Sequence, residues 1–464
     1  MKLGVVILAA GKGTRMRSAV PKVLHPLAGR PLLRHVLDAA EALGAARVCV
    51  VYGHGGAQVP STLADADCVW VEQAERLGTG HAVQQAMPEM NGMDRVLVLY
   101  GDVPLIEPET LNRLVSDSAA TSLGVLTMQL QDPTGYGRVV RDKRGQVLRI
   151  VEQKDASEAE LAITEVNTGI IVADGRRLAD WLGQIRNDNV QREYYLTDVI
   201  GFATAAGVEV VTTQPDSIQE VAGVNDRIQL AELERYHQRR VADGLMHAGV
   251  TLMDPARIDV RGTLECDRDV LIDVNLVCEG DVRIGHDVRI GPNCLLKDCE
   301  IGPGAQILAN SMIEGAKVGA GASVGPFARL RPGADIGHGC RIGNFVEIKQ
   351  ASIGTGSKVN HLSYVGDAEV GADVNVGAGT ITCNYDGASK HRTTIGDGAF
   401  IGSNTALVAP VTIGAGATLG AGSVIAQNAP PERLTLTRAP QRTIEHWQRP
   451  RKKLSDKGPK DQDH

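Results

Sequence analysis

The stretch 316-AKVGAGASVGPFARLRPGADIGHGCRIGNFVEI-348 repeats one six-residue phrase. A small or slim residue stands two positions before each aliphatic residue, and the aliphatic residues are Val318, Val324, Leu330, Ile336, Ile342 and Ile348. The phrase returns at Ile395, Ile401, Leu407, Ile413, Leu419 and Ile425. A hexapeptide period indicates a parallel β-helix, because stacked coils bury a column of side chains that no single hexad can bury. We therefore predict a parallel β-helix over roughly 281–427.

Two charged residues break the phrase where glycine is usual. Arg331 follows Leu330, and Lys349 follows Ile348, three hexads later. Three hexads make one coil in such β-helices, so we expect both cations on one edge, one coil apart. Like charges placed opposite each other destabilise a sheet. Either the two side chains splay into water, where charge pairs count for little, or an anion such as phosphate lies between them.

Composition limits the function classes. A chain of 464 residues predicts two or three domains, and a net charge of −7 argues against a general nucleic-acid surface. We expect no membrane span, because no apolar run approaches the required length. The eight cysteines include no C-x-x-C pair, and Cys294 and Cys340 occupy the small-residue position of the repeat. Free thiols in a reducing compartment follow, and we expect the cytoplasm.

The first half alternates apolar strand patterns with helical ones. Residues 3–9 form a continuous apolar run, which is typical of a central parallel strand. Further strands are predicted at 47–52, 67–71, 95–100, 123–128 and 147–151, and helices at 31–43, 79–87 and 108–118. This alternation predicts an α/β domain with a mainly parallel sheet covered on both faces. Ligands bind at the carboxyl ends of the strands in such sheets.

A glycine-rich turn, GKGTRM at 11–16, follows the first strand. It matches neither the P-loop nor the dinucleotide pattern, yet its backbone N–H groups can approach a phosphate. Lys12, Arg15 and Lys22 add positive charge, which favours a triphosphate. Asp102 ends the segment YGD at another strand end. It could be a ligand of Mg²⁺, which takes few protein ligands, or it could cap the turn before Pro104.

The remaining segments complete the domain plan. Residues 225–248 predict one exposed spacer helix, with Ile228, Leu233 and Tyr236 as a narrow apolar stripe. A polar insertion at 383–393 interrupts the repeat, and loops that leave a regular scaffold often carry function. His361 lies within a coil of Lys349, so we favour a functional role over a solvated corner. We expect domains at 1–226 and 249–448, a linker helix at 227–248 and a disordered tail at 449–464.

Motifs in both halves resemble known families. LAAGKGTRM followed by Pro21-Lys22, then QAERLGTGHA and YGDVPL, are similar to sugar nucleotidyltransferase signatures. NHLSYVGD and CNYDG are similar to segments of hexapeptide acyltransferases. Nearly the whole chain resembles the bacterial bifunctional UDP-N-acetylglucosamine pyrophosphorylases/glucosamine-1-phosphate N-acetyltransferases. The resemblance implies a Rossmann-like uridylyltransferase domain, a left-handed β-helix and a cytoplasmic homotrimer that binds neither nucleic acid nor membrane. It also implies a role in peptidoglycan and lipopolysaccharide synthesis.

The resemblance implies the substrates and site residues of the first activity. The N-terminal domain would join N-acetylglucosamine 1-phosphate to UTP and release pyrophosphate. Asp102 and Asn225 would bind Mg²⁺. The residues implied to surround the nucleotide sugar are Leu8, Ala9, Ala10, Gly11, Lys22, Gln73, Gly78, Thr79, Tyr100, Gly101, Asp102, Gly137, Glu152, Asn167 and Asn225.

The same resemblance assigns the second activity to the β-helix. It would transfer acetyl from acetyl-CoA to glucosamine 1-phosphate, with His361 as the general base. The residues implied to bind the sugar phosphate are Arg331, Lys349, Tyr364 and Asn375. The residues implied to line the acetyl-CoA site are Ala378, Asn384, Tyr385, Ser403, Ala421 and Arg438.

Two other functions remain open on the residues alone. The β-helix could be only a trimerisation or regulatory module of a sugar-1-phosphate nucleotidyltransferase. The whole chain could also be a non-catalytic binder of sugar nucleotides. His361 beside two cations argues against a purely structural array. Release of pyrophosphate that requires a metal would argue against a mere binder.

Overall fold

The computed structural model describes residues 1–53, 55–118 and 123–450. Its chain divides into two compact units, Met1–Pro332 and Gly333–His464. Most of the tail predicted to be disordered, 451–464, lies outside the described residues. Among the residues that are described, no helix is both long and apolar enough to cross a membrane.

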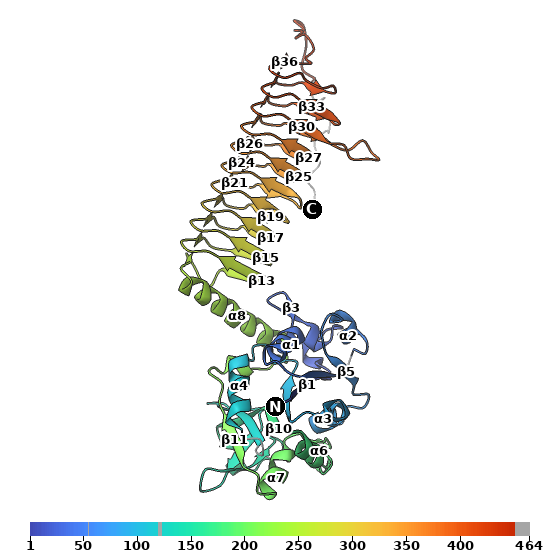
Figure 1. Ribbon diagram of the computed structural model, residues 1–464, viewed down its shortest axis with the longest axis vertical. Helices are drawn as coiled ribbons and strands as arrows, with labels where there is room; N and C mark the ends of the chain where they lie inside the picture. Colours follow the sequence, from blue (N-terminus) through green and yellow to red (C-terminus); the bar gives the residue numbers. More distant parts are fainter. Residues whose placement is uncertain (54, 119–122, 451–464) are drawn as a thin grey trace, which may run out of the picture. The chain divides into compact units, whose positions relative to one another are not determined.

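The first unit begins with a mostly parallel sheet (Figure 1). Strand β1 pairs in parallel with β4 and β6, β4 with β5, and β7 with β11, whereas β10 runs antiparallel to β6 and β7. A hairpin of β8 and β9 joins the sheet through β10. In spatial order the strands are β11 (Val210–Thr213), β7 (Leu123–Gln129), β10 (Glu165–Asp174), β6 (Arg95–Tyr100), β1 (Leu3–Ala9), β4 (Arg47–Tyr52) and β5 (Val69–Glu72), with β8 (Arg138–Arg141) and β9 (Val147–Val151) beside them.

Helices cover both faces of this sheet, because successive side chains of a strand point to opposite faces. Val5 and Ile7 of β1 pack in one core with α1, α2 and α4, and Val6 and Leu8 pack in another with α3, α6 and α7. The helices are α1 (Leu32–Ala42), α2 (Gln58–Thr62), α3 (Thr79–Ala86), α4 (Pro108–Asp117), α5 (Glu158–Leu161), α6 (Gly175–Leu182) and α7 (Asp198–Ala205). Short 3₁₀ turns are η1 (Thr14–Met16), η2 (Lys22–Leu24), η3 (Met87–Met90) and η4 (Gln219–Val221), and β2 (Pro26–Leu27) pairs with β3 (Arg30–Pro31).

Each strand and helix predicted in the first 151 residues is present within two residues of its expected bounds. Strand β10 was not predicted. Polar residues interrupt its apolar run at Asn167 and Thr168, and its pairing with β7 shifts register between Asn167 and Ile171. The antiparallel strand in the middle of the sheet is therefore the main departure from the predicted alternation.

Helix α8 (Arg227–His247) occupies the predicted spacer segment. The carboxylate of Asp226 caps it by accepting bonds from the N–H groups of Ile228 and Gln229, both at 2.9 Å. Leu233 is buried as predicted, but Ile228 is 72% exposed, so its place in the apolar stripe was wrong. Buried Gln238 donates to the carbonyl and accepts from the N–H of Val260, both at 2.8 Å. This side chain ties the helix to the first coil.

The coils that follow in the first unit are stacked in parallel (Figure 1). The aliphatic residues of the repeat that fall here, Val318, Val324 and Leu330, are buried, as predicted. One column of strands is β12 (Thr251–Leu252), β14 (Leu271–Ile272), β16 (Arg289–Ile290), β18 (Gln306–Ile307) and β21 (Ser323–Val324). The other is β13 (Ile258–Cys266), β15 (Leu276–Ile284), β17 (Leu295–Ile301), β19 (Met312–Glu314) and β22 (Arg329–Leu330), with β20 (Lys317–Val318) beside β17.

A ladder of alternating charges runs along these coils. Glu265, Arg283, Glu300 and Lys317 stand opposite one another in the strand register. The charged atoms of successive members lie 3.3, 4.0 and 3.5 Å apart. Opposite charges across a ladder stabilise pairing and like charges oppose it, so this sequence of signs favours the observed register.

The second unit continues as parallel coils. The rest of the aliphatic column, from Ile336 to Ile425, is buried as predicted. Its strands are β23 (Ala334–Ile336), β24 (Arg341–Asn344), β25 (Glu347–Ile353), β26 (Lys358–His361), β27 (Tyr364–Val370), β28 (Asn375–Val376), β29 (Ile381–Cys383), β30 (Thr393–Ile395), β31 (Phe400–Ile401), β32 (Ala406–Val408), β33 (Val411–Ile413), β34 (Thr418–Leu419), β35 (Val424–Ile425) and β36 (Leu434–Thr435).

The predicted insertion appears as a jump in register. Arg341 stands opposite Lys358, and Phe400 stands opposite Thr418, which are ordinary one-coil offsets. Asn375, in contrast, stands opposite Phe400, about seven residues more than a coil needs. The excess residues form the loop that leaves the β-helix after β29.

We expect Gln238→Leu to destabilise the protein. The substitution leaves the buried N–H and C=O of Val260 without their side-chain partner, and an unsatisfied buried group costs about 1–3 kcal/mol. Urea unfolding followed by circular dichroism would measure the loss. The matched change Glu232→Leu, at an exposed position of the same helix, should leave the midpoint nearly unchanged. Equal midpoints for the two variants would contradict this role of Gln238.

Candidate active sites

Predicted nucleotide-binding residues follow the carboxyl ends of three of four adjacent parallel strands, β1, β5 and β6. Ala9 stands opposite Tyr52, Tyr52 opposite Glu72, and Leu8 opposite Tyr100. The chain leaves these strand ends through Ala10-Gly11, Gln73 and Gly101-Asp102. The fold therefore gathers groups from distant parts of the sequence at one edge of the sheet, where ligands of open α/β sheets bind.

The glycine-rich turn packs closely on Lys22. Gly13 has φ +57°, and a Cβ there would lie 2.6 Å from Cβ of Lys22. Only glycine combines this left-handed backbone with so close an approach. The turn ends in the 3₁₀ segment η1, and Lys22 begins η2. The backbone thus directs the Lys22 side chain toward the strand ends.

The ammonium of Lys22 joins two residues that the sequence predicts as metal ligands. It donates a hydrogen bond to Asp102 and lies 3.4 Å from the amide oxygen of Asn225. Asn225 is brought there because the N–H of Val224 donates to the carbonyl of Asp102 at 2.8 Å. The three side chains come from positions 22, 102 and 225, so this convergence is a product of the fold.

This arrangement fits a small divalent cation. Two side-chain oxygens already converge on one positive charge, and Mg²⁺ needs few protein ligands because it keeps waters and phosphate oxygens. Throughout the described ranges, no cluster of three or more His, Cys, Asp or Glu side chains could hold a metal. A metal at this point would depend on Asp102 and Asn225 alone.

A second group of predicted residues forms the start of α3. Buried Gln73 donates to the carbonyl of Gly78 at 3.2 Å and lies 3.0 Å from Nδ1 of His81. Gly78 precedes the helix with φ +112°, and a Cβ there would lie 2.6 Å from the carbonyl oxygen of Tyr194. The hydroxyl of Thr79 accepts a bond from the N–H of Leu196 at 3.1 Å. These contacts fix the helix N-terminus beside the strand ends.

The third group contains the residues predicted around the sugar. The N–H of Asn167 donates to the carbonyl of Gly137 at 2.9 Å, and a Cβ on Gly137 would lie 3.5 Å from the Glu152 carboxylate. Burial raises the pKa of Glu152, and a hydrogen bond from Thr197 at 3.1 Å opposes that rise. Burial, with the nearby charges of Glu152 and Asp102, also raises the pKa of Tyr100.

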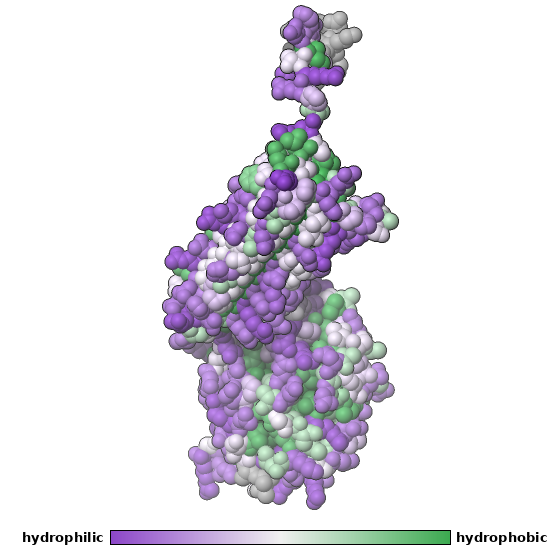
Figure 2. All heavy atoms as spheres, turned by 45° about the horizontal axis from the view of Figure 1, so that its top comes forward, coloured by the Kyte–Doolittle hydropathy of each residue, from purple (hydrophilic) through white to green (hydrophobic). Residues whose placement is uncertain are grey.

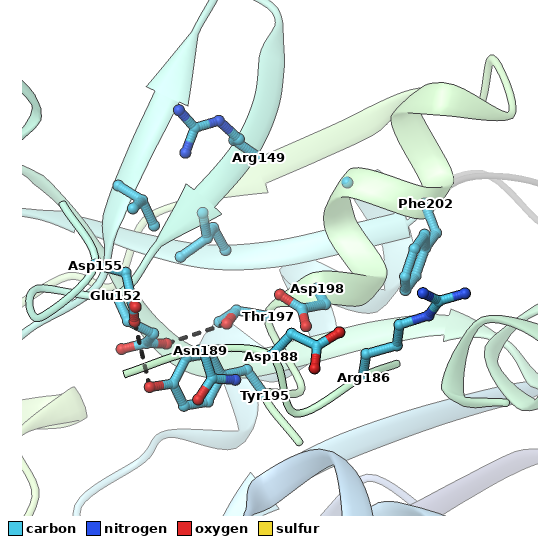
Figure 3. A pocket seen from close by; sticks show the side chains of 13 residues that line it. Arg149, Glu152, Asp155, Arg186, Asp188, Asn189, Tyr195, Thr197, Asp198 and Phe202 are labelled. Atoms are coloured by element: carbon cyan, nitrogen blue, oxygen red, sulfur yellow. Dashed lines mark hydrogen bonds between the residues drawn. The ribbon is translucent and has the colours of Figure 1, made fainter. Parts of the chain in front are cut away.

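A pocket of about 500 Å³ opens beside Glu152 (Figure 3). Figure 3 shows Glu152 bonded to Thr197, and Tyr195 bonded to Asp155 at 3.3 Å. Burial and the neighbouring Asp155 raise the pKa of Asp198 in the same pocket. Of the predicted nucleotide-sugar residues only Glu152 lines it. Thr197 is therefore a neighbour of the predicted site that sequence reasoning missed.

In the second unit, His361 is held by a side chain from the preceding coil. Asn344 stands opposite His361 in the ladder, and its amide oxygen lies 2.7 Å from Nδ1 of the imidazole. With the amide oxygen as the acceptor, the contact fits the tautomer that carries its proton on Nδ1 and keeps the lone pair on Nε2. Asn344 was not singled out from the sequence, because its partner becomes evident only in the coil register.

His361 also belongs to a column of residues on successive coils. On each coil, the backbone N–H of the residue after the column member donates to the backbone carbonyl of the member on the preceding coil. The four bonds measure 3.1, 3.3, 2.7 and 2.8 Å. The members are Asn344, His361, Ala378, Ser403 and Ala421. Three residues predicted at the acetyl-CoA site therefore share one corner of the coils with the predicted base, and all three are small.

Tyr364, Asn384 and Asp367 form a connected polar group beside this corner. Nδ2 of Asn384 lies 3.3 Å from the Tyr364 hydroxyl and donates a hydrogen bond to Asp367. Tyr364 leans over Gly366, where a Cβ would lie 2.3 Å from its hydroxyl. Lys349 stands opposite Gly366 in the ladder. Asp367 was not predicted, and its role is to fix the Asn384 amide.

The remaining predicted residues lie on the same run of coils. Asn375 is half-buried between Lys358 and Phe400 in the ladder. A Cβ on Gly420 would lie 3.6 Å from the Arg438 guanidinium, which places Arg438 near the far end of the corner column. Tyr385 is exposed in the inserted loop.

The inserted loop has its own internal order. Tyr385 forms a bridge with Lys390, and the Asp386 carboxylate accepts bonds from the N–H groups of Ala388 and Ser389 and from Nε2 of His391. These bonds lower the pKa of Asp386. Arg331 follows β22 in the first unit, whereas Lys349 lies in the second. The predicted pairing of these two cations stays a prediction.

All eight cysteines fall in the described part of the chain and are free thiols. Burial raises the pKa of Cys294 and of Cys340, which are both buried at the small-residue position of the repeat. Their role is packing, as the sequence predicts.

Comparisons with known proteins cover both halves. Residues 5–163 match the MobA-like NTP transferase domain, and residues 315–350 and 392–427 match the bacterial transferase hexapeptide repeats. The hexapeptide match agrees with the left-handed winding expected for the β-helix. The first match contains Lys22, Gln73 and Asp102 of the strand-end site. The second contains Asn344, Ser403 and Ala421 of the corner column, whereas His361 and Ala378 lie between its two segments.

Curated relatives extend over nearly the full length. The bifunctional protein GlmU of Azoarcus sp. (strain BH72) is 60% identical over 96% of this chain and 99% of its own. Those of Aromatoleum aromaticum and Stutzerimonas stutzeri are each 59% identical, over 97% and 98% of this chain and 99% and 100% of theirs. The chain is an enzyme that belongs to the GlmU family, which joins a nucleotidyltransferase domain to a hexapeptide acyltransferase domain.

Proposed function

We propose that the chain makes UDP-N-acetylglucosamine in two steps. The β-helix acetylates glucosamine 1-phosphate from acetyl-CoA, and the N-terminal domain then transfers uridylyl from UTP to N-acetylglucosamine 1-phosphate and releases pyrophosphate. The product would serve peptidoglycan and lipopolysaccharide synthesis in the cytoplasm. The observation that carries the proposal is the placement of His361 on one corner with three small residues of the following coils.

Uridylyl transfer brings a phosphate anion against a triphosphate, so neutralisation and in-line positioning account for most of the barrier reduction. The turn after β1 and Lys22 would hold UTP phosphates, and Gln73, Gly78 and Thr79 would hold the uridine side. Mg²⁺ on Asp102 and Asn225 would supply further neutralising charge. Tyr100, Gly137, Glu152 and Asn167 would surround the sugar and ribose. No protein nucleophile is required.

Acetyl transfer needs a neutral amine. Nε2 of His361 would accept a proton from the sugar ammonium, and the neutral amine would then attack the thioester carbonyl. As the C–S bond breaks, coenzyme A would leave as its thiolate, which takes up the second proton lost by the nitrogen. The bond from Nδ1 to Asn344 supports this role, because it leaves Nε2 as the acceptor.

The two substrates would bind on either side of this imidazole. Arg331 and Lys349 would hold the sugar phosphate, and Tyr364, Asn375 and Asn384 the sugar. Coenzyme A would run along the small-residue corner formed by Ala378, Ser403 and Ala421, because small side chains leave room for a long flexible ligand. Asn384, Tyr385 and Arg438 would contact it from the side.

A purely structural β-helix is the competing function. It would still need the buried aliphatic column, the tight corners and the free thiols. It would not need a histidine whose Nδ1 is bonded to an amide oxygen on the neighbouring coil. That contact favours the bifunctional enzyme.

A homotrimer is the assembly we propose. Phe345 and Leu362 occupy equivalent positions of successive coils at φ +56° and +51°, and they are 56% and 63% exposed. Left-handed backbone is costly for large side chains, and adjacent exposed apolar groups suggest an interface. Figure 2 shows further apolar atoms at the surface of the last coils, where Val424, Leu434 and Leu436 are exposed.

The two activities should separate by single substitutions. We expect His361→Ala to abolish release of coenzyme A from acetyl-CoA and glucosamine 1-phosphate while pyrophosphate release from UTP is kept. Asp102→Ala should do the reverse. Unchanged acetyl transfer in His361→Ala would remove the base assignment and favour the structural β-helix.

Asn344→Leu should change the tautomer of His361. Without the amide oxygen, the proton is no longer held at Nδ1, so less of the imidazole keeps its lone pair on Nε2. Long-range ¹⁵N–¹H spectra of histidine-labelled protein would report this, with the His361 signals identified by their absence in His361→Ala. We expect kcat for acetyl transfer to fall roughly 10–100-fold, a loss of about 1.4–2.7 kcal/mol. Asn344→Asp should restore most of it. An unaltered tautomer would refute the role of Asn344.

Leu362→Glu should weaken the trimer, because it places charge in an apolar contact. Analytical ultracentrifugation would compare the wild-type protein, at three times the 49.2 kDa chain mass, with the variant. Ile228→Glu, at an equally exposed apolar residue on α8, is the control and should leave the mass unchanged. A monomeric wild-type protein would contradict the proposed assembly.

A further inference from the structure

Lys22 occupies the point where the two proposed metal ligands converge. Its ammonium donates to the Asp102 carboxylate and lies 3.4 Å from the amide oxygen of Asn225. The side chains of Lys22 and Asp102 are only 11% and 19% exposed, so the charge pair is largely removed from water. One positive charge therefore already satisfies the oxygens that a metal would need.

We propose that Lys22 is an internal substitute for the metal, and that it must leave Asp102 before a divalent cation can bind there. This rests on the assignment of Asp102 and Asn225 as metal ligands. An ammonium and a divalent cation on the same carboxylate repel each other where little water screens them, so the ammonium weakens binding of the metal. In the free enzyme Lys22 thus competes with the metal.

The ion pair of Lys22 with Asp102 in place of a metal also stabilises the fold. A carboxylate left unpaired in a partly buried position destabilises a fold. Lys22 neutralises Asp102 and keeps Asn225 close to it when no metal is bound. The two ligands are therefore held near each other before the metal arrives, although they are far apart in sequence.

The same geometry couples metal binding to nucleotide binding. Lys22 has the glycine turn on one side, where a triphosphate would lie, and Asp102 on the other. Phosphate oxygens offer its ammonium a second partner. When a nucleotide takes up that partner, Asp102 becomes available to the cation. Coupling between two sites is reciprocal, so the metal should also favour the nucleotide.

The test is a titration of the nucleotide-free enzyme with Mn²⁺, in which electron paramagnetic resonance measures the free Mn²⁺. We expect Lys22→Met and Lys22→Gln to tighten binding about tenfold, within the usual range of coupling between sites. Lys143→Met removes the same charge from an exposed position in the turn between β8 and β9 and should change the affinity less than about twofold. Asp102→Ala should abolish the site.

A second measurement separates competition from a general charge effect. With a saturating non-hydrolysable UTP analogue, Lys22 has left Asp102 in the wild-type enzyme, so the gap in Mn²⁺ affinity between wild type and Lys22→Met should shrink. Mn²⁺ should also raise the Tm of nucleotide-free Lys22→Met more than that of wild type, because stabilisation by a ligand grows with the logarithm of its affinity. The Tm of each variant also confirms that it is folded.

The outcomes distinguish the inference from the function on which it rests. Equal or weaker Mn²⁺ binding in both Lys22 variants, with the site still lost in Asp102→Ala, would contradict the role of Lys22 as a substitute for the metal. The assignment of Asp102 and Asn225 as metal ligands would be unaffected. Mn²⁺ binding that persists in Asp102→Ala would remove the ligand assignment and the inference together.

Discussion

The whole second half depends on one constraint: a hexad cannot bury its aliphatic side chain unless another coil lies against it. Every coil must therefore stack, and parallel stacking sets residues about 17 or 18 positions apart opposite each other. Because of this register Asn344 meets His361, and Glu265, Arg283, Glu300 and Lys317 form a ladder of alternating signs. Polar contacts on the outside are thus a consequence of apolar burial on the inside.

The two candidate sites bring their residues together in different ways. In the N-terminal domain, parallel strands end at one edge, and the loops that leave them bring together residues as distant as Lys22, Asp102 and Asn225. On the β-helix, the residues already lie in a line, and each coil contributes one member to the corner column. The first arrangement suits a compact charged reaction centre. The second suits a long cofactor laid along a surface.

The sequence predicts the regular parts well because they depend on repeated, local patterns. The apolar run at 3–9, the strand and helix alternation and the hexad period all reappear as expected. Prediction fails where tertiary contacts decide. The polar residues Asn167 and Thr168 interrupt the apolar pattern of β10, so the strand was not predicted. Ile228 was placed in the apolar stripe of α8 but faces solvent, whereas Leu233 of that stripe is buried. Sequence patterns do not indicate Asn344, Asp367 or Thr197 as site residues, because each contacts its partner from another strand, coil or loop.

The terminal position of β36 has a further consequence. In the described chain this strand pairs with β34 alone, so the last coil is supported from one side. In a stack of repeats, stability comes from neighbouring pairs, and opening begins at an unsupported end. Amide hydrogens of the final coil would then exchange with solvent sooner than those around His361. The proposed contact of coenzyme A with Arg438 would then also stabilise the last coil against opening.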